Sequence, residues 1–85
     1  MITYQIQLQP RARKEFLALP VDIASKVHEA IRSLQTDPRP RQSIQLSGGQ
    51  GHRLRIGDYR VLYEIDDAAN KVTVYRIKHR REAYR

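Results

Sequence analysis

Residues 54–65 read LRIGDYRVLYEI, and this stretch decides the fold. On both sides of Gly57-Asp58, apolar and polar residues alternate with the period of two that is typical of a strand with one buried face. A Gly-Asp pair between two such runs predicts a two-residue hairpin turn. We therefore expect a strand over residues 52–56, a tight turn, and a second strand over residues 59–65.

Strand-like alternation continues outward from this hairpin. Apolar residues at every second position of residues 2–8 predict a first strand. Residues 72–78 predict a last strand, but Val72 and Val74 share a parity with Arg76 and Lys78, so either a bulge intervenes or both faces are partly buried. The stretch 36–51 holds two prolines and three glycines and is expected to be a connecting loop, in which residues 44–46 could form a further short strand.

Between the first strand and this loop, the apolar spacing changes to that of helices. Pro10 suits the first turn of a helix; Pro20 ends that helix and opens a second one, which Asp37-Pro38 ends. The apolar positions are Ala12, Phe16 and Leu19 in the first helix, and Ile23, Val27, Ala30, Ile31 and Leu34 in the second. The expected fold is α+β, of order β-α-α-β-β-β, with a two-helix hairpin on one face of a mainly antiparallel four-stranded sheet. The other face is left free.

Length and composition exclude several classes of protein. Eighty-five residues are too few for two cores, so we expect one domain over residues 1–85. There is no cysteine, and the three histidines are scattered, so no metal site and no cofactor are expected. Asp66 and Asp67 lie in a turn, where such residues are common for backbone reasons. The glycines of residues 47–51 lack the Lys-Ser/Thr of a phosphate-binding loop. No apolar run approaches the ~20 residues of a membrane span, which indicates a cytoplasmic protein with no membrane partner.

The net charge is strongly positive and unevenly distributed. Sixteen Lys and Arg against nine Asp and Glu give a formal charge of +7. Residues 39–60 carry five arginines against Asp58 alone, and residues 76–85 carry five cations against Glu82 alone, so these two stretches hold the whole excess. Twelve of the sixteen cations are arginine, which suits planar, bidentate recognition of phosphate. A polyanion is one expected partner, and an acidic protein is the other.

The strand registers place Arg53, Arg55 and Arg60 together on the free face of the sheet. Arg60 lies within the otherwise apolar segment YRVLY, where burial of a charge is costly, so we expect it to be exposed and to contact a ligand. Arg53 and Arg55 either contact the same ligand or only keep the face soluble. His52, at the start of the strand, is either structural or a contact at the rim of the site.

The C-terminal segment KHRREAYR, residues 78–85, combines cations with two possible proton carriers. RNA cleavage by its own 2'-hydroxyl needs a base, an acid for the leaving 5'-oxygen, and positive charge on the phosphorane between them. His79 and Tyr84 could carry protons, and Lys78, Arg80 and Arg81 supply charge. Tyr84 could instead stack on a base or pin the tail to the sheet, and His79 could be an ordinary surface residue.

Taken together, LRIGDYRVLYEI and YRIKHRREAYR resemble the core of the RelE/ParE toxin superfamily. The hairpin carries its Gly-x-Tyr-Arg motif, the tail carries His-Arg followed by Tyr-Arg, and Leu19-Pro20 lies at the joint of the helices. The resemblance implies the toxin of a type II toxin-antitoxin pair. It also implies an acidic cognate antitoxin as partner, in a toxin-antitoxin hetero-oligomer.

RelE-type members cut messenger RNA on the ribosome, whereas ParE-type members bind gyrase, and the retained terminal tyrosine favours the RelE type. By motif, the resemblance assigns catalysis to Arg60, Arg80 and Tyr84, with His79 as a second candidate base. It also assigns Arg53 and Arg55 to a basic cluster on the sheet, and we expect these two to bind RNA together with His52, Lys78 and Arg81. Some members have lysines on the first hairpin strand as the proposed base, and this chain has His52, Arg53 and Arg55 there. Arginine is a poor base at neutral pH, which makes His79 or Tyr84 the better candidate.

Overall fold

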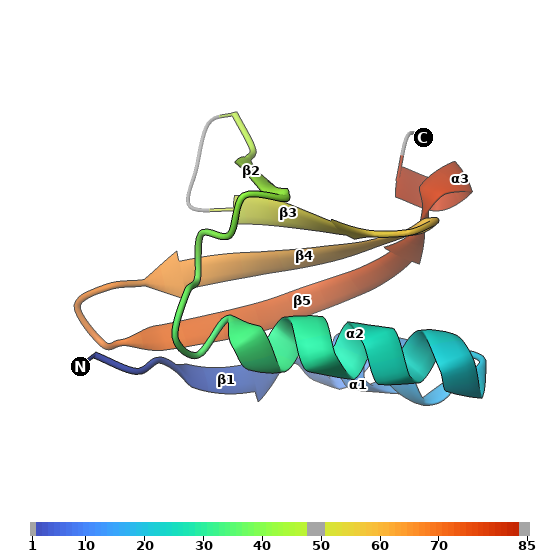
Figure 1. Ribbon diagram of the computed structural model, residues 1–85, viewed down its shortest axis with the longest axis horizontal. Helices are drawn as coiled ribbons and strands as arrows, with labels where there is room; N and C mark the ends of the chain where they lie inside the picture. The colour runs from blue at the N-terminus through green and yellow to red at the C-terminus, as the bar shows by residue number, and fades with distance from the viewer. Residues whose placement is uncertain (1, 48–50, 84–85) are drawn as a thin grey trace.

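Two helices cover one face of a five-stranded mixed sheet (Figure 1). The structure is a computed structural model, and it describes residues 2–47 and 51–83. Its elements are β1 (Gln5–Leu8), α1 (Pro10–Leu17), α2 (Val21–Ser33), β2 (Ser43–Gln45), β3 (Gly51–Ile56), β4 (Tyr59–Asp66), β5 (Lys71–His79) and α3 (Arg80–Ala83).

The strand order is β1-β5-β4-β3-β2, with β1 parallel to β5 and all other pairs antiparallel. The expected α+β class is confirmed. The sheet has five strands where four were expected, because the loop after α2 contributes the short edge strand β2. The four-residue helix α3 was not predicted, since its charged residues show no apolar periodicity.

The core lies between the helices and one face of the sheet. Alternate residues of β4 from Val61 to Ile65 are buried there, as expected for a strand between a covered and an open face, and so are Val72, Val74 and Ile77 of β5. The buried apolar residues are Ala12, Val27, Ile31 and Leu34 from the helical half, and Leu54, Val61, Tyr63, Ile65, Val72, Val74 and Ile77 from the sheet. The opposite face of the sheet is left for the polar residues of the same strands.

Two local features set the direction of the side chains on β4 and β5. Gly57 opens the turn between β3 and β4 with a φ of 58°, a conformation that a residue with a Cβ adopts only with strain. The pairing register between β4 and β5 shifts at Leu62 and Tyr63 of β4. Leu62 pairs with Arg76, whereas Tyr63 pairs with Val74, so β5 has one more residue than β4 at this point. A bulge therefore intervenes on β5, which settles the parity conflict in the sequence of this strand.

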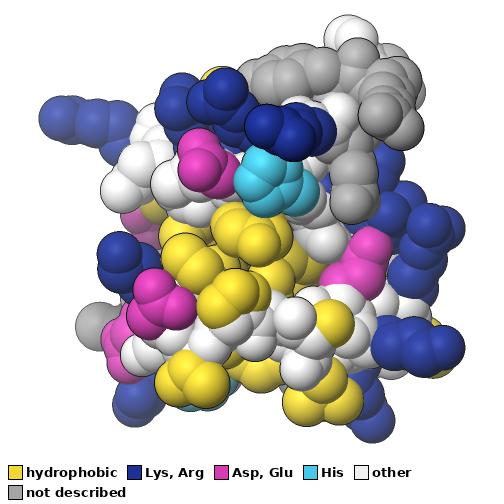
Figure 2. All heavy atoms as spheres, turned by 90° about the vertical axis from the view of Figure 1, so that its right-hand side faces the viewer, with side chains coloured by type: hydrophobic (Ala, Val, Ile, Leu, Met, Phe, Trp, Pro, Cys, Tyr) yellow, Lys and Arg dark blue, Asp and Glu magenta, His cyan; other side chains and the backbone are white. Residues whose placement is uncertain are grey.

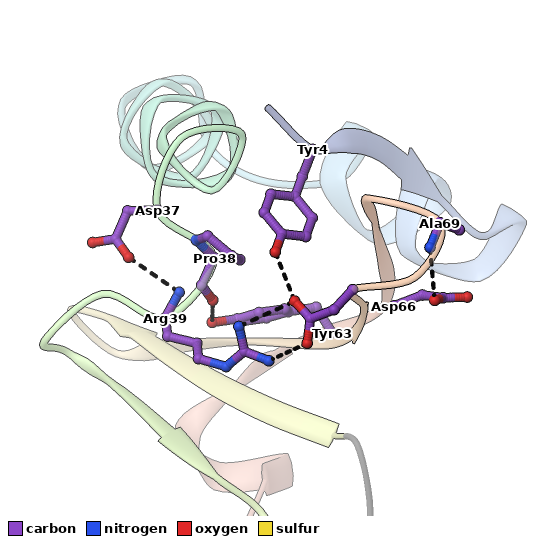
Figure 3. Close-up of polar contacts among 8 residues, drawn as sticks. Tyr4, Asp37, Pro38, Arg39, Tyr63, Asp66 and Ala69 are labelled. Atoms are coloured by element: carbon purple, nitrogen blue, oxygen red, sulfur yellow. Dashed lines mark hydrogen bonds and ion pairs between the residues drawn. The ribbon is translucent and has the colours of Figure 1, made fainter. Parts of the chain in front are cut away.

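The loop after α2 is fastened across the covered face of the sheet (Figure 3). The buried hydroxyl of Tyr63 donates a hydrogen bond of 2.8 Å to the carbonyl oxygen of Pro38. Burial raises the pKa of Tyr63, so this phenol remains a neutral donor. Asp37 accepts a hydrogen bond of 3.3 Å from the backbone amide of Arg39. These contacts carry the chain from α2 to β2.

Asp66 and Asp67 are both used within the protein, at the turn between β4 and β5. Asp66 Oδ1 accepts a bond from the amide of Ala69, at 3.0 Å. Asp67 accepts one from the hydroxyl of Tyr4 at 2.6 Å and is paired with Arg39 at 2.8 Å (Figure 3). The bond from Arg39, followed by that from Tyr4, lowers the pKa of Asp67. The bond to Asp67 raises the pKa of Tyr4.

The outer edge of β5 is covered by a carboxylate where β1 ends. Glu15 of α1 accepts a bond from the amide of Ile77 at 2.8 Å, and from Arg76 Nε at 3.0 Å and Nη2 at 2.9 Å. The side chains of Glu15 and Arg76 are 22% and 17% exposed. Glu15 thus satisfies a backbone donor that would otherwise lie on an open strand edge, and it fixes α1 beside β5.

Candidate nucleic-acid interface

The open face of the sheet carries two cross-strand rows of cations. Arg55, Arg60 and Lys78 are direct neighbours on β3, β4 and β5. In the next row, Arg53 and Arg76 flank Leu62. We call this surface the cationic face, and its members are Arg53, Arg55, Arg60, Leu62, Arg76 and Lys78. Like charges directly opposite one another repel, which destabilises the sheet along this row. An anion bound along the rows would relieve the repulsion.

Arg60 lies at the centre of the first row, and the expectation that it is exposed is wrong. The residue is only 3% exposed. Its Nη1 donates hydrogen bonds of 3.1 Å to the carbonyl oxygens of Gly57 and of Tyr59. The two-residue turn brings both carbonyls within reach of the side chain, and these bonds offset part of the cost of burying the charge. Arg60 therefore stabilises the turn between β3 and β4 through its buried side chain.

Arg80, the first residue of α3, contacts the same turn from the end of β5. Its backbone amide donates a hydrogen bond of 2.6 Å to the carbonyl oxygen of Asp58, and its Nη1 lies 3.8 Å from Asp58 Oδ1. Both side chains of this ion pair are more than half exposed, so the guanidinium is available to a ligand. Three consecutive carbonyls of residues 57–59 thus accept bonds from Arg60 or Arg80, and both arginines converge on one end of the sheet.

His79 lies on the other side of the sheet from Arg60. It pairs with Tyr59 in the register, and the two rings meet edge to face with centroids 5.2 Å apart. His79 Nδ1 accepts a bond of 3.3 Å from the backbone amide of Arg81. Arg81 itself is exposed on α3. The structure therefore groups His79 with the start of α3, at the turn side of the molecule.

Among the described residues that were predicted for the site, Arg53, Arg55, Arg60 and Lys78 belong to the cationic face, whereas His52, His79, Arg80 and Arg81 do not. His52 is 7% exposed and stacks on the buried ring of Tyr63, with centroids 5.5 Å apart. Its side chain belongs to the covered face, which favours the structural role over the contact at the rim. Tyr84 lies outside the described residues. Arg76, by contrast, is on the cationic face and was not predicted there, because the strand alternation left its direction open; the Glu15 ion pair accounts for its anchoring.

Figure 2 views the end of the molecule at which β5 finishes. Lys and Arg side chains gather along the upper and right-hand margins of this end, around an apolar area between the sheet and the helices. Within residues 2–47 and 51–83, no group of three histidine, aspartate or glutamate side chains is placed to hold a metal ion. In the same part of the chain, no helix is long and apolar enough to cross a membrane. The most prominent feature of this end of the described surface is its group of Lys and Arg side chains.

Comparison with known proteins gives a consistent result. The family model for the ParE toxin of type II toxin-antitoxin systems matches residues 6–84. Toxin RelG of Mycobacterium tuberculosis is 32% identical, over 96% of this chain and 97% of the relative. A putative toxin, RelE1, of Methanocaldococcus jannaschii is 27% identical, over 96% of both chains. The solved archaeal RelE-RelB complex from Pyrococcus horikoshii contains a chain with a TM-score of 0.84 and 27% identity, covering 93% of this chain and 97% of that one.

The chain belongs to the RelE/ParE superfamily of toxins from type II toxin-antitoxin systems. Within that superfamily, its named relatives are RelE-type toxins. The family indicated by the hairpin and tail motifs is thereby confirmed.

Proposed function

We propose that this toxin is a ribosome-dependent endoribonuclease that cuts messenger RNA and so inhibits translation in the cytoplasm. The observation that carries the proposal is the cationic face, whose first row lies close to the turn that both Arg60 and Arg80 contact. Phosphates would lie beside the exposed Arg55 and the partly exposed Arg53 and Lys78, with one phosphodiester at that turn. Arginine suits this task because its planar fork binds phosphate oxygens in pairs.

The proposed reaction is attack of a ribose 2'-hydroxyl on the adjacent phosphorus. The new 2'-O–P bond forms as the bond to the 5'-oxygen breaks, which gives a 2',3'-cyclic phosphate and a 5'-hydroxyl. The exposed guanidinium of Arg80 would stabilise the negative charge of the phosphorane directly. The buried guanidinium of Arg60 would add its positive charge from beneath the turn. A base takes the 2'-proton, and an acid protonates the leaving oxygen.

His79 and Tyr84 remain the two candidates for proton transfer. His79 is half-buried, its Nδ1 is engaged by the amide of Arg81, and its ring faces away from the row of Arg60. This placement counts against His79 as the base, so we propose Tyr84 for that role on the strength of the family motif. The variants His79→Asn and Tyr84→Phe separate the two roles, because only loss of the true base removes the corresponding limb of the pH-rate profile.

An acidic antitoxin is the proposed partner. The similar chain from Pyrococcus horikoshii was solved as a RelE-RelB complex. In this chain, the excess of positive charge lies on residues 39–60 and 76–85, which include the cationic face. An antitoxin with acidic segments that cover this face would form a toxin-antitoxin hetero-oligomer and block access to RNA.

The decisive experiment is induction of the toxin in a strain without antitoxin, followed by primer extension on abundant transcripts. We expect translation to stop and cuts to appear inside translated regions. Arg80→Ala should abolish the cuts, whereas Arg13→Ala, which removes an exposed arginine from α1, should retain them. Growth arrest with intact transcripts would refute the nuclease.

The match to the ParE model favours a second candidate, a toxin that binds gyrase. That activity predicts DNA damage soon after induction while translation is still unaffected. Pulse labelling of protein synthesis alongside a reporter of DNA damage distinguishes the two, because the order of the two effects is reversed.

A further inference from the structure

The bulge on β5 gives the open face an aromatic ring that strand alternation alone does not predict. Val74 pairs with Tyr63 and Arg76 pairs with Leu62, so Tyr75 is the extra residue between two successive pairs. In a bulge, two neighbouring residues oppose one residue of the partner strand, and bulges commonly redirect a side chain. Tyr75 and Arg76 are consecutive in the chain, yet both belong to the open face.

The position of the Tyr75 hydroxyl shows how its ring lies. A Cβ built on Gly51 would be 3.2 Å from this oxygen, although Gly51 is on β3 and Tyr75 is on β5. Because β4 runs between these strands, the ring must reach across β4 on the open face. The missing side chain of Gly51 makes the room for it. Burial, followed by the charge of Glu64, raises the pKa of Tyr75, so the phenol stays neutral.

The ring lies next to the cationic face along β4. Glu64 is two residues from Leu62, and Leu62 is two residues from Arg60, so the rows follow one another at steps of roughly 7 Å. Such a step is comparable with the repeat of an extended ribonucleotide. A half-buried ring that crosses β4 beside the cationic face combines the two elements that bind single-stranded nucleic acid: a positive track for the backbone and an aromatic platform for a base.

We propose that Tyr75 is a stacking platform for one base of a single-stranded ribonucleotide whose backbone lies on the cationic face. The inference rests on the proposed function and adds to it a binding subsite about two nucleotides from the turn. Arg76 is directed away from this base by its ion pair with Glu15, so it borders the subsite without occupying it. The ring accepts any base, because stacking is tolerant of sequence.

The test uses a five-nucleotide RNA with 2-aminopurine at one position at a time, and matched RNAs with an abasic site at that position. We expect the fluorescence of 2-aminopurine at one position to be quenched on binding. Tyr75→Leu should weaken binding of the intact RNA by about 5- to 100-fold and remove the quenching, since stacking on an aromatic side chain contributes that much. The same variant should change binding of the abasic RNA by less than twofold. Tyr75→Phe, which keeps the ring, should behave like the parent protein.

Three outcomes overturn the inference. If Tyr75→Leu binds within twofold of the parent protein and quenches every probe equally, the ring only covers the sheet, while the proposed nuclease function stands. If the parent protein shows no salt-dependent RNA binding, the cationic face itself is misassigned and both proposals fail. A measurement on the parent protein avoids dependence on how the variants fold: the ring protons of Tyr75 should shift upfield in the NMR spectrum when RNA is added, and unchanged shifts in a bound complex would also refute the subsite.

Discussion

Replacement of Arg60 by alanine should destabilise the protein substantially. The substitution removes two charge-assisted hydrogen bonds, to the carbonyls of Gly57 and Tyr59. Bonds to charged groups contribute roughly 1.5–3 kcal/mol each, but one nitrogen serves both here and water can reach the turn, so we count about 2 kcal/mol. The buried stem adds about 1–2 kcal/mol of apolar burial.

Removal of the repulsion between like charges partly offsets this loss of stability. Arg55 and Lys78 are directly opposite Arg60, and each like-charge pair destabilises the sheet by roughly 0.2–1 kcal/mol. The net expectation is a loss of about 2–3 kcal/mol in the free energy of unfolding. Arg60→Met keeps much of the stem and should lose about 1 kcal/mol less than Arg60→Ala.

Urea denaturation followed by circular dichroism measures these differences, with Arg55→Ala as the matched control. The control removes an exposed arginine from the same row and relieves one like-charge pair, so it should leave stability unchanged or raise it by up to about 1 kcal/mol. If Arg60→Ala were as stable as the parent protein to within about 0.5 kcal/mol, the bonds to the turn would not matter and the account of its burial would be refuted. The expected loss also means that inactivity of Arg60→Ala in cells shows a role in catalysis only once folding has been verified.

Three further substitutions test the contacts that hold the fold. Glu15→Gln should cost about 2 kcal/mol, between the values for exposed and buried ion pairs, because Arg76 loses its partner; a urea titration that shows no change would refute this. Tyr63→Phe should cost about 1–2 kcal/mol in the same assay by leaving a buried carbonyl without its donor, and an unchanged midpoint would count against it. The pKa of Asp67 is lowered in the folded state, so its contribution is present above its ordinary value of 3.8 and is lost as pH falls through the lowered value. Asp67→Asn should therefore lower the melting temperature at pH 7 and leave it equal to that of the parent protein in strong acid; equal melting temperatures at both would contradict the assignment.

Much of this fold could be predicted from residue patterns because it depends on local rules. Alternation in residues 54–65 and the Gly57-Asp58 pair gave the central hairpin, and the spacing of apolar residues gave both helices. The short strand β2 is held by its pairing with β3, which a three-residue pattern does not specify. The parity of β5 could be narrowed to two alternatives, but the choice of a bulge depends on the register with β4.

The candidate site was predicted only in part, for a related reason. Register alone placed Arg53, Arg55 and Arg60 on one face. It could not show that the turn carbonyls draw the guanidinium of Arg60 inward, since that depends on distances across the hairpin. His52 shares the parity of Leu54, which predicts that its side chain faces the covered side of the sheet. Nothing in the residue pattern predicted that Tyr75 lies on the open face, because its direction depends on the bulge in β5.

Cleavage of messenger RNA by the purified toxin on programmed ribosomes tests the central claim most directly. With the parent protein, we expect discrete cuts in the ribosome-bound message, each leaving a cyclic phosphate and a 5'-hydroxyl. Arg80→Ala should fold normally and cut at least about 100-fold more slowly, since the loss of one group that stabilises a transition-state charge has an effect of this size. A folded parent protein that leaves the message intact on the ribosome, or an Arg80→Ala variant that cuts at the parent rate, would contradict the account.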